Sequence, residues 1–393
     1  MASASANGVP GEFTPPAFTE LSEVASAGSN GSVLFATDDW FAPAEWMLKD
    51  AEPVFLPGEY TPFGKWMDGW ETRRKRVPGH DWCLLELGAP VKIAGFVIDT
   101  AFFTGNYAPR VSIQGGTLDA TIKQMLQTSI PRKTGPDGMI GTGRTAEEVG
   151  MVELIGTDQW DVLLPRVELN PGYEQTRRQY FTVPKGKQAL VVSHLRVNMF
   201  PDGGIARLRV HGTVKLNLTA CLTGKVPIDA IAMLNGGRCT GFSNAHFGHP
   251  RNLIKPSEGT NMGDGWETAR RLDRPPILQV DEGGILQVPG CEWATFQLGT
   301  SDGCWIERVC IDTNHFKGNF PDNARVDYGG LEEDPDRWVP LMERKKLGPH
   351  RLHEFHKGED LLPQTTPATR IRITIAPDGG LSRVRIFGTI ARD

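Results

Sequence analysis

The sequence lacks any long hydrophobic run. No apolar stretch of the 393-residue chain approaches the roughly 20 residues that a membrane-spanning helix needs. The N-terminus, MASASANGVPGEFTPP, has neither a basic start nor an apolar core, so we expect no secretory signal. We expect residues 1–30 to form a disordered tail, and we expect no membrane partner.

An excess of positive charge is also absent. The chain has 42 Lys and Arg against 47 Asp and Glu, which gives a formal net charge of -5 and a pI of about 6.0. A nucleic-acid-binding protein usually carries a basic patch, so we expect no nucleic-acid partner. The short basic run RRKR at 73–76 is most simply a solvated loop.

Familiar catalytic and metal-binding motifs are missing as well. The sequence contains no HExxH, GxSxG or CxxC, so nothing in it supports a serine or cysteine nucleophile or a zinc-protease site. The cysteines show no metal spacing and no disulfide pattern; they are Cys83, Cys221, Cys239, Cys291, Cys304 and Cys310. We expect reduced thiols and a cytoplasmic location.

The sequence is instead rich in turn-forming residues, and it contains an internal repeat. Gly 45 and Pro 29 favour many turns and short strands. Four blocks recur in the same order: KWMDGWETRR (65–74) and NMGDGWETAR (261–270), VPGHDWCLLELG (77–88) and VPGCEWATFQLG (288–299), GFVIDTAFFTGNY (95–107) and RVCIDTNHFKGNF (308–320), PDGGIARLRVHGT (201–213) and PDGGLSRVRIFGT (377–389). Four matched blocks indicate two copies of one domain.

The spacing of the blocks predicts the domain boundaries. We expect a first repeat at 31–215, a linker at 216–237 and a second repeat at 238–393. The difference in residue number between matching blocks is not constant along the chain. It predicts that the first repeat has extra residues at 117–150 and that the second repeat has an insertion near LDRPPILQVDEGGILQV. Short alternating segments such as ARLRVHGTV and RIRITIA predict strands. The prediction is an all-β protein of two tandem jelly-roll sandwiches, with a short helix at 226–234 and a second helix within 117–150.

The DGWET blocks and the loops after IDT carry the polar residues that suggest a site. Glycine and tryptophan also suit a plain turn anchored on the sandwich, so this structural interpretation stays open. Histidines at spacing three (His350, His353, His356) suit metal ligands on one helical face, but they equally suit an ordinary surface segment. His246 and His249 allow the same two interpretations.

Several long, Trp-rich blocks resemble the allantoicase family. They are DDWFAPAEWMLK (38–49), KWMDGWETRRKR (65–76), GHDW (79–82), IDTAFFTGNY (98–107), SNAHFGHPRNLI (243–254), NMGDGWET (261–268) and IDTNHFKGNFPD (311–322). The resemblance covers about 31 to 390. It implies two jelly rolls of the galactose-binding-like kind and an amidinohydrolase that converts allantoate and water into ureidoglycolate and urea in purine breakdown.

The chemistry of that substrate suggests roles for the matched residues. Loss of urea needs a general acid and base, and the substrate carboxylate needs cationic or amide donors. The candidates for acid–base work are Glu71, Asp68, His80, Glu267, Asp264 and His315. The candidates for substrate binding are Arg73, Arg270, Asn106, Lys317 and Asn319. The sequence requires no cofactor, a divalent metal is possible but unsupported, and we expect a homo-oligomer.

The two copies differ in ways that leave the working site open. His80 is answered by Cys291, Arg73 by Ala269 and Gln179 by His353. Two other classes remain as alternatives. A non-catalytic carbohydrate-binding protein would need an exposed aromatic platform, and a metal hydrolase would need the histidine clusters to converge.

Overall fold

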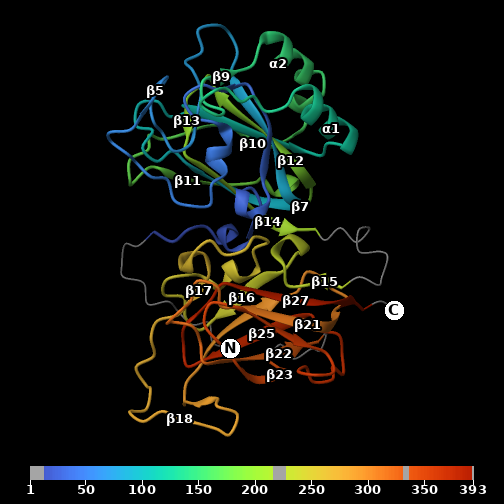
Figure 1. The fold of residues 1–393 in the computed structure, drawn as a ribbon. Helices are drawn as coiled ribbons and strands as arrows, with labels where there is room; N and C mark the ends of the chain where they lie inside the picture. The colour runs from blue at the N-terminus through green and yellow to red at the C-terminus, as the bar shows by residue number, and fades with distance from the viewer. Residues whose placement is uncertain (1–12, 216–226, 331–335, 392–393) are drawn as a thin grey trace.

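The chain forms two lobes, each containing one copy of the repeat (Figure 1). The computed structural model describes residues 13–215, 227–330 and 336–391. Each lobe has its own large hydrophobic cluster, which confirms the prediction of two tandem domains. None of the helices in this described part is long and apolar enough to cross a bilayer.

The second repeat is a sandwich of two antiparallel sheets. The four-stranded sheet has the order β15-β27-β21-β24 and the five-stranded sheet the order β16-β20-β25-β22-β23. The strands are β15 (Ile228–Asp229), β16 (Arg238–Phe242), β20 (Glu292–Gln297), β21 (Cys304–Asp312), β22 (Asn323–Gly329), β23 (Val339–Lys346), β24 (Leu352–His356), β25 (Arg370–Ala376) and β27 (Arg383–Ile390). Apolar side chains alternate along these strands and fill the space between the sheets, as a jelly roll requires.

The first repeat has the same strand order, but one long strand joins its two sheets. This strand, β7 (Asp81–Asp99), pairs with β2 and β12 along its first half and with β11 and β14 along its second. The other strands are β1 (Ser22–Glu23), β2 (Ser32–Ala36), β8 (Arg110–Gly116), β10 (Asp161–Glu168), β11 (Arg178–Thr182), β12 (Val191–Phe200) and β14 (Arg207–Val214). The predicted all-β jelly-roll architecture is therefore confirmed in both repeats.

Each DGWET block forms a short strand beside the PDGG block of the same repeat. β6 (Trp70–Glu71) pairs with β13 (Gly204–Ile205), and β17 (Trp266–Glu267) pairs with β26 (Gly380–Leu381). The tryptophan is fully buried in both copies, and its indole N–H donates to a backbone carbonyl. The tryptophan thus anchors the block and fixes the direction of the glutamate that follows it.

The remaining elements are short. Three two-residue pairs are β3 (Asp38–Asp39) with β9 (Thr142–Gly143), β4 (Tyr60–Thr61) with β5 (Gly64–Lys65), and β18 (Gln279–Val280) with β19 (Leu286–Gln287). The 3-10 turns are Ala17–Glu20, Ala27–Ser29, Ala44–Leu48, Thr157–Gln159, Lys185–Lys187, Met233–Asn235, Pro250–Ile254 and Met262–Asp264.

The helix predictions are half correct. The segment 117–150 holds α1 (Ala120–Ser129), capped by Asp119, and the start of α2 (Ala146–Glu153), capped by Thr145 and Glu148. The helix predicted at 226–234 is wrong. There Ile228 and Asp229 pair with β27, and Ile231 is buried, because strand pairing and burial outweigh helix propensity.

The predicted boundaries need two corrections. From Phe13 onward the N-terminal segment is ordered rather than a disordered tail: Phe18 lies against Gly95, and β1 pairs with β14. Residues 1–12 and 216–226 lie outside the described part of the chain. The second repeat begins before residue 238, because β15 already belongs to its four-stranded sheet.

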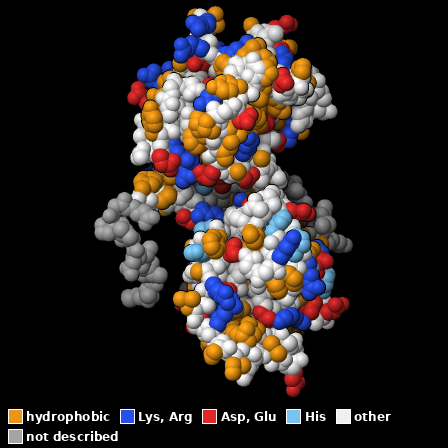
Figure 2. All heavy atoms as spheres, turned by 60° about the vertical axis from the view of Figure 1, so that its left-hand side comes forward, with side chains coloured by type: hydrophobic (Ala, Val, Ile, Leu, Met, Phe, Trp, Pro, Cys, Tyr) orange, Lys and Arg blue, Asp and Glu red, His pale blue; other side chains and the backbone are white. Residues whose placement is uncertain are grey.

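The two lobes meet at a waist where acidic and basic side chains gather (Figure 2). A cleft of about 540 Å³ lies there, lined by the N-terminal segment and by residues of both repeats. Arg251 of the second repeat donates to the carbonyl of Thr19 at 3.0 Å, so the N-terminal segment bridges the lobes.

Candidate active site

The glutamate of the first DGWET block meets the asparagine of the first GNY block. Asn106 Nδ2 donates to Glu71 Oε1 at 2.6 Å. The DGWET block and the loop after IDT, whose polar residues suggested a site, thus meet in the first repeat. This contact arises because β6 and the loop after β7 both lie beside β13, where Tyr107 forms a bridge with Gly204.

Glu71 and Asn106 line a cavity of about 590 Å³ at one end of the first sandwich. Its wall combines aromatic rings with a few charged groups; it comprises Phe41, Phe55, Lys65, Met67, Phe102, Thr104, Gly172, Tyr173, Glu174 and Arg177 besides the two residues of the pair. Apolar walls with a small number of convergent polar groups are typical of small-molecule sites.

Glu71 is the titratable group best suited to proton transfer in this cavity. Its side chain is almost buried, with 8% of the residue exposed. Burial raises its pKa to about 7, and the hydrogen bond from Asn106 opposes that rise. No cationic side chain among the described residues forms a salt bridge with it. A carboxyl group with a pKa near neutrality can both give and take a proton.

The loop 50–65 forms part of the wall of this cavity, and the second repeat has no loop of the same length at the equivalent position. In the first repeat Lys49 binds Asp68, 19 residues later; in the second, Lys255 binds Asp264 only 9 residues later. The loop of the first repeat is therefore ten residues longer. It brings Phe55 and Lys65 to the cavity wall.

Two charged wall residues were missed by the sequence analysis. Lys65 Nζ lies 4.2 Å from the centre of the Phe55 ring and forms no ion pair with any described residue. The repeat gave only a weak indication of Lys65, because the second copy has Asn261 at the equivalent position. Arg177 comes from the edge of β11, outside all four repeated blocks.

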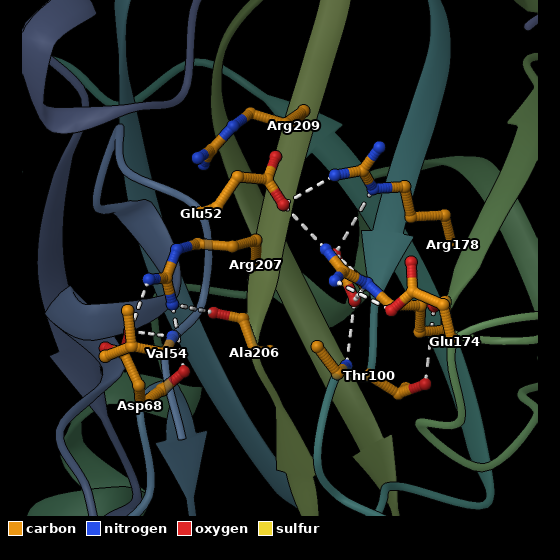
Figure 3. Close-up of polar contacts among 12 residues, drawn as sticks. Glu52, Val54, Asp68, Thr100, Glu174, Arg178, Ala206, Arg207 and Arg209 are labelled. Atoms are coloured by element: carbon orange, nitrogen blue, oxygen red, sulfur yellow. Dashed lines mark hydrogen bonds and ion pairs between the residues drawn. The ribbon is translucent and has the colours of Figure 1, made fainter. Parts of the chain in front are cut away.

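Arg177 is held in place from two sides. Asp99 accepts from its Nε and Nη2 atoms at 3.1 and 2.7 Å, and Glu52 of the loop 50–65 accepts from Nη2 at 2.7 Å. Figure 3 shows Glu52 reaching across toward Arg178, which it also binds. The ion pairs of Glu52 clamp the loop onto β11.

The same position in the second repeat is built differently. Asn319 Nδ2 donates to Glu267 Oε1, so the pair itself is repeated. Yet Glu267 is only half-buried, and His315 stands where Phe102 lines the first cavity. The Nε2 atom of His315 forms a hydrogen bond with the Gly259 carbonyl at 2.8 Å. Arg351, which answers Arg177, is exposed and donates to His353.

The first acid of each DGWET block is held in a structural ion pair. Asp68 binds Lys49 at 2.7 Å and Arg207 at 2.6 Å, and Asp264 binds Lys255 and Arg383 in the same way. Burial favours a higher pKa for Asp68, but hydrogen bonds from Arg207 and Lys49 hold it below its ordinary value. Figure 3 shows Arg207 reaching from β14 to Asp68. We therefore withdraw the two aspartates as proton donors.

His80 lies away from the Glu71 cavity. It lines a separate cavity of about 410 Å³ over strands β8, β10 and β12 of the first repeat, where its Nε2 meets Asn198 Oδ1 at 3.1 Å. Its ring lies against Phe200, and burial lowers its pKa. His80 does not join Glu71 in one site, because it precedes β7 whereas Asn106 follows that strand.

The remaining predicted clamps are not in the cavity wall. Arg73 is paired with Asp38 at 2.6 Å and covers the Trp40 ring. Arg270 and Lys317 are exposed on the second repeat. Of the predicted binding residues, only Asn106 lines the cavity that contains Glu71.

Of the two interpretations of the histidine cluster, a metal-binding helical face does not match the structure. His353 and His356 lie on strand β24, and the buried His353 accepts from Gly348 N and meets the Ile311 carbonyl. Among the described residues, no three His, Cys, Asp or Glu side chains are placed to hold a metal ion.

Comparisons with known proteins agree with the duplicated architecture. A family model described as the allantoicase repeat matches residues 22–215 and 228–391. A probable allantoicase of Rhizobium meliloti (strain 1021) is 38% identical over 392 residues, which cover 97% of both chains. A probable allantoicase of Acinetobacter baumannii (strain ACICU) is also 38% identical and covers 96% of this chain and 98% of its own. The crystal structure of allantoicase from Saccharomyces cerevisiae is 30% identical, covers 93% of this chain and 92% of its own, and has a TM-score of 0.66.

Proposed function

The chain belongs to the allantoicase family, and we propose that it hydrolyses allantoate to ureidoglycolate and urea in the cavity of its first repeat. The observation that carries the location is the near-neutral carboxyl of Glu71, which is buried in the wall of a cavity large enough for this small substrate. The second repeat has a structural role in this proposal. It lacks a counterpart of the long loop 50–65, so the wall of its equivalent site differs from that of the first cavity.

Substrate binding follows from the charges of the wall. Allantoate carries one carboxylate, and Lys65 is a cationic side chain of the cavity with no ion pair to any described residue. A compact ammonium group on a flexible stem can reach the carboxylate as a point charge. The rings of Phe41, Phe55 and Phe102 exclude water around the two ureido groups.

Glu71 performs the proton transfers in this proposal. Its protonated form donates to the ureido nitrogen that leaves. The bond between that nitrogen and the central carbon breaks while the lone pair of the second ureido nitrogen forms a C=N bond to the same carbon. Water then bonds to the central carbon as the C=N electron pair returns to nitrogen, and the proton lost by water passes to the Glu71 carboxylate, so the acid is regenerated and the products are urea and ureidoglycolate. Asn106 orients the carboxyl through its hydrogen bond.

Urea release from allantoate tests the function, and a pair of matched variants tests the location. Glu71→Gln keeps the shape of the side chain but cannot transfer protons. We expect it to lower kcat by roughly a hundredfold to ten-thousandfold. Glu267→Gln, in the equivalent position of the second repeat, should change kcat less than threefold, because that glutamate lies outside the first cavity. Equal activity of the two variants would move or remove the proposed site.

The non-catalytic alternative is less well supported. A carbohydrate-binding site needs an exposed aromatic platform, whereas both DGWET tryptophans are fully buried. We also propose a cytosolic location, on the basis that the five cysteines of the described residues are free thiols, as in a reducing compartment.

A further inference from the structure

An arginine of the first repeat carries a charge that no carboxylate pairs with. Arg196 of β12 is almost buried, with 3% of the residue exposed, and it lines the cavity of about 410 Å³ that contains His80. Its Nε donates to Asn198 Oδ1 and its Nη1 to Thr157 Oγ1, both at 3.0 Å. Its Nη2 has no hydrogen-bond partner among the described residues, and its guanidinium carbon lies 3.8 Å from the centre of the Trp82 ring. We call this space the Arg196 cavity.

The second repeat has a cavity at the equivalent place, and there a carboxylate is present. The IDT blocks align Gln114 with Asp327. Across the sheet, Gln114 pairs with Arg196. In the same way, Asp327 pairs with Arg372. Asp327 is 1% exposed and binds Arg372 at 3.1 Å and Arg325 at 2.8 Å. The first repeat thus retains the arginine but has a neutral glutamine where the counter-ion stands in the second.

The guanidinium group of Arg196 therefore lacks a neighbouring negative charge, and a buried charge without a partner costs free energy. Burial accordingly lowers the pKa of Arg196. The carboxylates of Asp158 and Glu153 attract it at longer range, but neither forms a salt bridge with it in the described part of the chain. Asp158 also lines the cavity, where it is exposed to solvent and accepts from Gln159. An oxyanion bound at Arg196 would supply the charge that Asp327 supplies in the second repeat.

A second arginine lines the Arg196 cavity. Arg166 of β10 is exposed and forms no ion pair with any described residue; its guanidinium carbon lies 3.6 Å from the centre of the Phe200 ring. The His80 ring also lies against Phe200, so this wall is partly aromatic. Guanidinium groups present several N–H donors in a planar fork that matches the oxygens of carboxylates and phosphates. A cavity of this size with two arginines and one aspartate in its lining suits a small anion.

We propose that the Arg196 cavity binds a small oxyanion, either a carboxylate or a phosphate, between Arg196 and Arg166. The Nη2 atom of Arg196 donates to one oxygen of the anion, and the exposed side chain of Arg166 binds another oxygen from the solvent side. None of the residues that line this cavity lines the Glu71 cavity, so the oxyanion site is independent of the proposed catalytic site.

Calorimetric titration of the full chain with inorganic phosphate and, separately, with oxalate tests the proposal. We expect one anion to bind per chain, with a Kd of roughly 0.1–5 mM for at least one of the two probes. Binding of phosphate alone assigns the site to phosphates, and binding of oxalate alone assigns it to carboxylates. Binding of neither probe overturns the proposal.

Two variants of the first repeat place the bound anion in this cavity. Gln114→Glu keeps the size of the side chain and adds a carboxylate beside Arg196, so it provides an internal counter-ion. We expect it to weaken anion binding by roughly ten- to a hundredfold without lowering the temperature of unfolding. Arg196→Gln should weaken binding by a similar factor, because it removes the buried donor.

Arg344→Gln is the matched control. It removes the same charge from the equivalent cavity of the second repeat, where Arg344 binds the neutral side chain of Asn323, and the Kd should change less than twofold. Thermal unfolding followed by circular dichroism checks that each variant folds; Gln114→Glu retains the packing of Arg196 and decides the test if Arg196→Gln does not fold. An unchanged Kd in Gln114→Glu, or an equal loss of binding in Arg344→Gln, would overturn the proposal.

Discussion

At the scale of single residues, Glu71 shows a conflict between stability and chemistry. The folded chain places its carboxyl in an almost buried wall with one amide donor and no paired cation. Ionising this buried carboxyl requires more free energy than ionising an exposed glutamate. The site therefore keeps an acid that is poorly suited to the fold at high pH, as proton-transfer groups commonly are.

The difference in stability between Glu71→Gln and the wild type should accordingly depend on pH. The pKa of Glu71 is raised from 4.5 to about 7 in the folded chain, so the unfolded chain ionises first as pH rises. Stability is then lost progressively between those two values and does not return above them. Glutamine avoids this loss. We expect the variant to exceed the wild type in free energy of unfolding by about 1–3 kcal/mol at pH 8.

The measurement is urea-induced unfolding of both proteins at pH 5 and pH 8. The difference between them should be largest at pH 8 and shrink toward pH 5, where the folded wild type is mostly protonated. A difference that is the same at both pH values would mean that the Glu71 carboxyl has an ordinary pKa.

Other residues explain what the sequence could and could not predict. Glu71 and Asn106 belong to matched blocks, and the repeat itself implied that they meet. Asp68 sits in the same block, but its partner Arg207 lies 139 residues away, and no local pattern separates a paired aspartate from a free one. Charge and motif position alone therefore overestimated the number of acids available for catalysis.

At the scale of elements, the loop 50–65 makes the two repeats unequal. Offsets between the four blocks predicted the insertions at 117–150 and near 272–288, and the structure contains α1, the start of α2 and the β18–β19 hairpin there. The loop 50–65 escaped notice because all of it except Lys65 precedes the first compared block, so no offset between blocks records its length. Its residues reach the cavity through tertiary contacts: Glu52 pairs with Arg177 and Arg178, and the Phe55 ring stacks on that of Phe102.

Glu52→Gln should loosen this loop without touching the reacting atoms. The variant loses the ion pairs to Arg177 and Arg178 but keeps the size of the side chain. Since exposed ion pairs contribute about 0.5–1 kcal/mol, we expect KM for allantoate to rise roughly two- to fivefold. The kcat should stay within about twofold, because Glu71 remains in place.

Steady-state kinetics of urea release separate these two effects. Asp161→Asn provides the control, because it removes a surface ion pair with Lys187 elsewhere on the first repeat. A fall in kcat with unchanged KM for Glu52→Gln would mean that Glu52 serves the chemical step instead of the loop.

At the scale of the whole molecule, the N-terminal segment ties the duplicated lobes together. Phe18 lies against Gly95 of β7, where an added Cβ would come within 2.6 Å of its ring. The next residues meet the second repeat: Arg251 donates to the Thr19 carbonyl at 3.0 Å and lies 3.7 Å from Glu20. A segment that extends one sandwich and contacts the other couples the stability of the two domains.

Phe18→Ala should weaken both the first repeat and this coupling. Removing a buried phenylalanine ring typically costs about 3–5 kcal/mol, and a site near the edge of a sheet belongs at the lower end. We expect the first repeat to unfold at a temperature lower by roughly 5–10 °C. Because the segment no longer holds the lobes together, the unfolding of the two repeats should separate into two calorimetric transitions. Phe13→Ala is the matched control, since Phe13 is 68% exposed and its ring lies against that of Tyr180. It should shift the unfolding temperature by less than about 2 °C. Differential scanning calorimetry of the three proteins decides the matter: if Phe18→Ala unfolds as the wild type does, the N-terminal segment contributes nothing to either lobe.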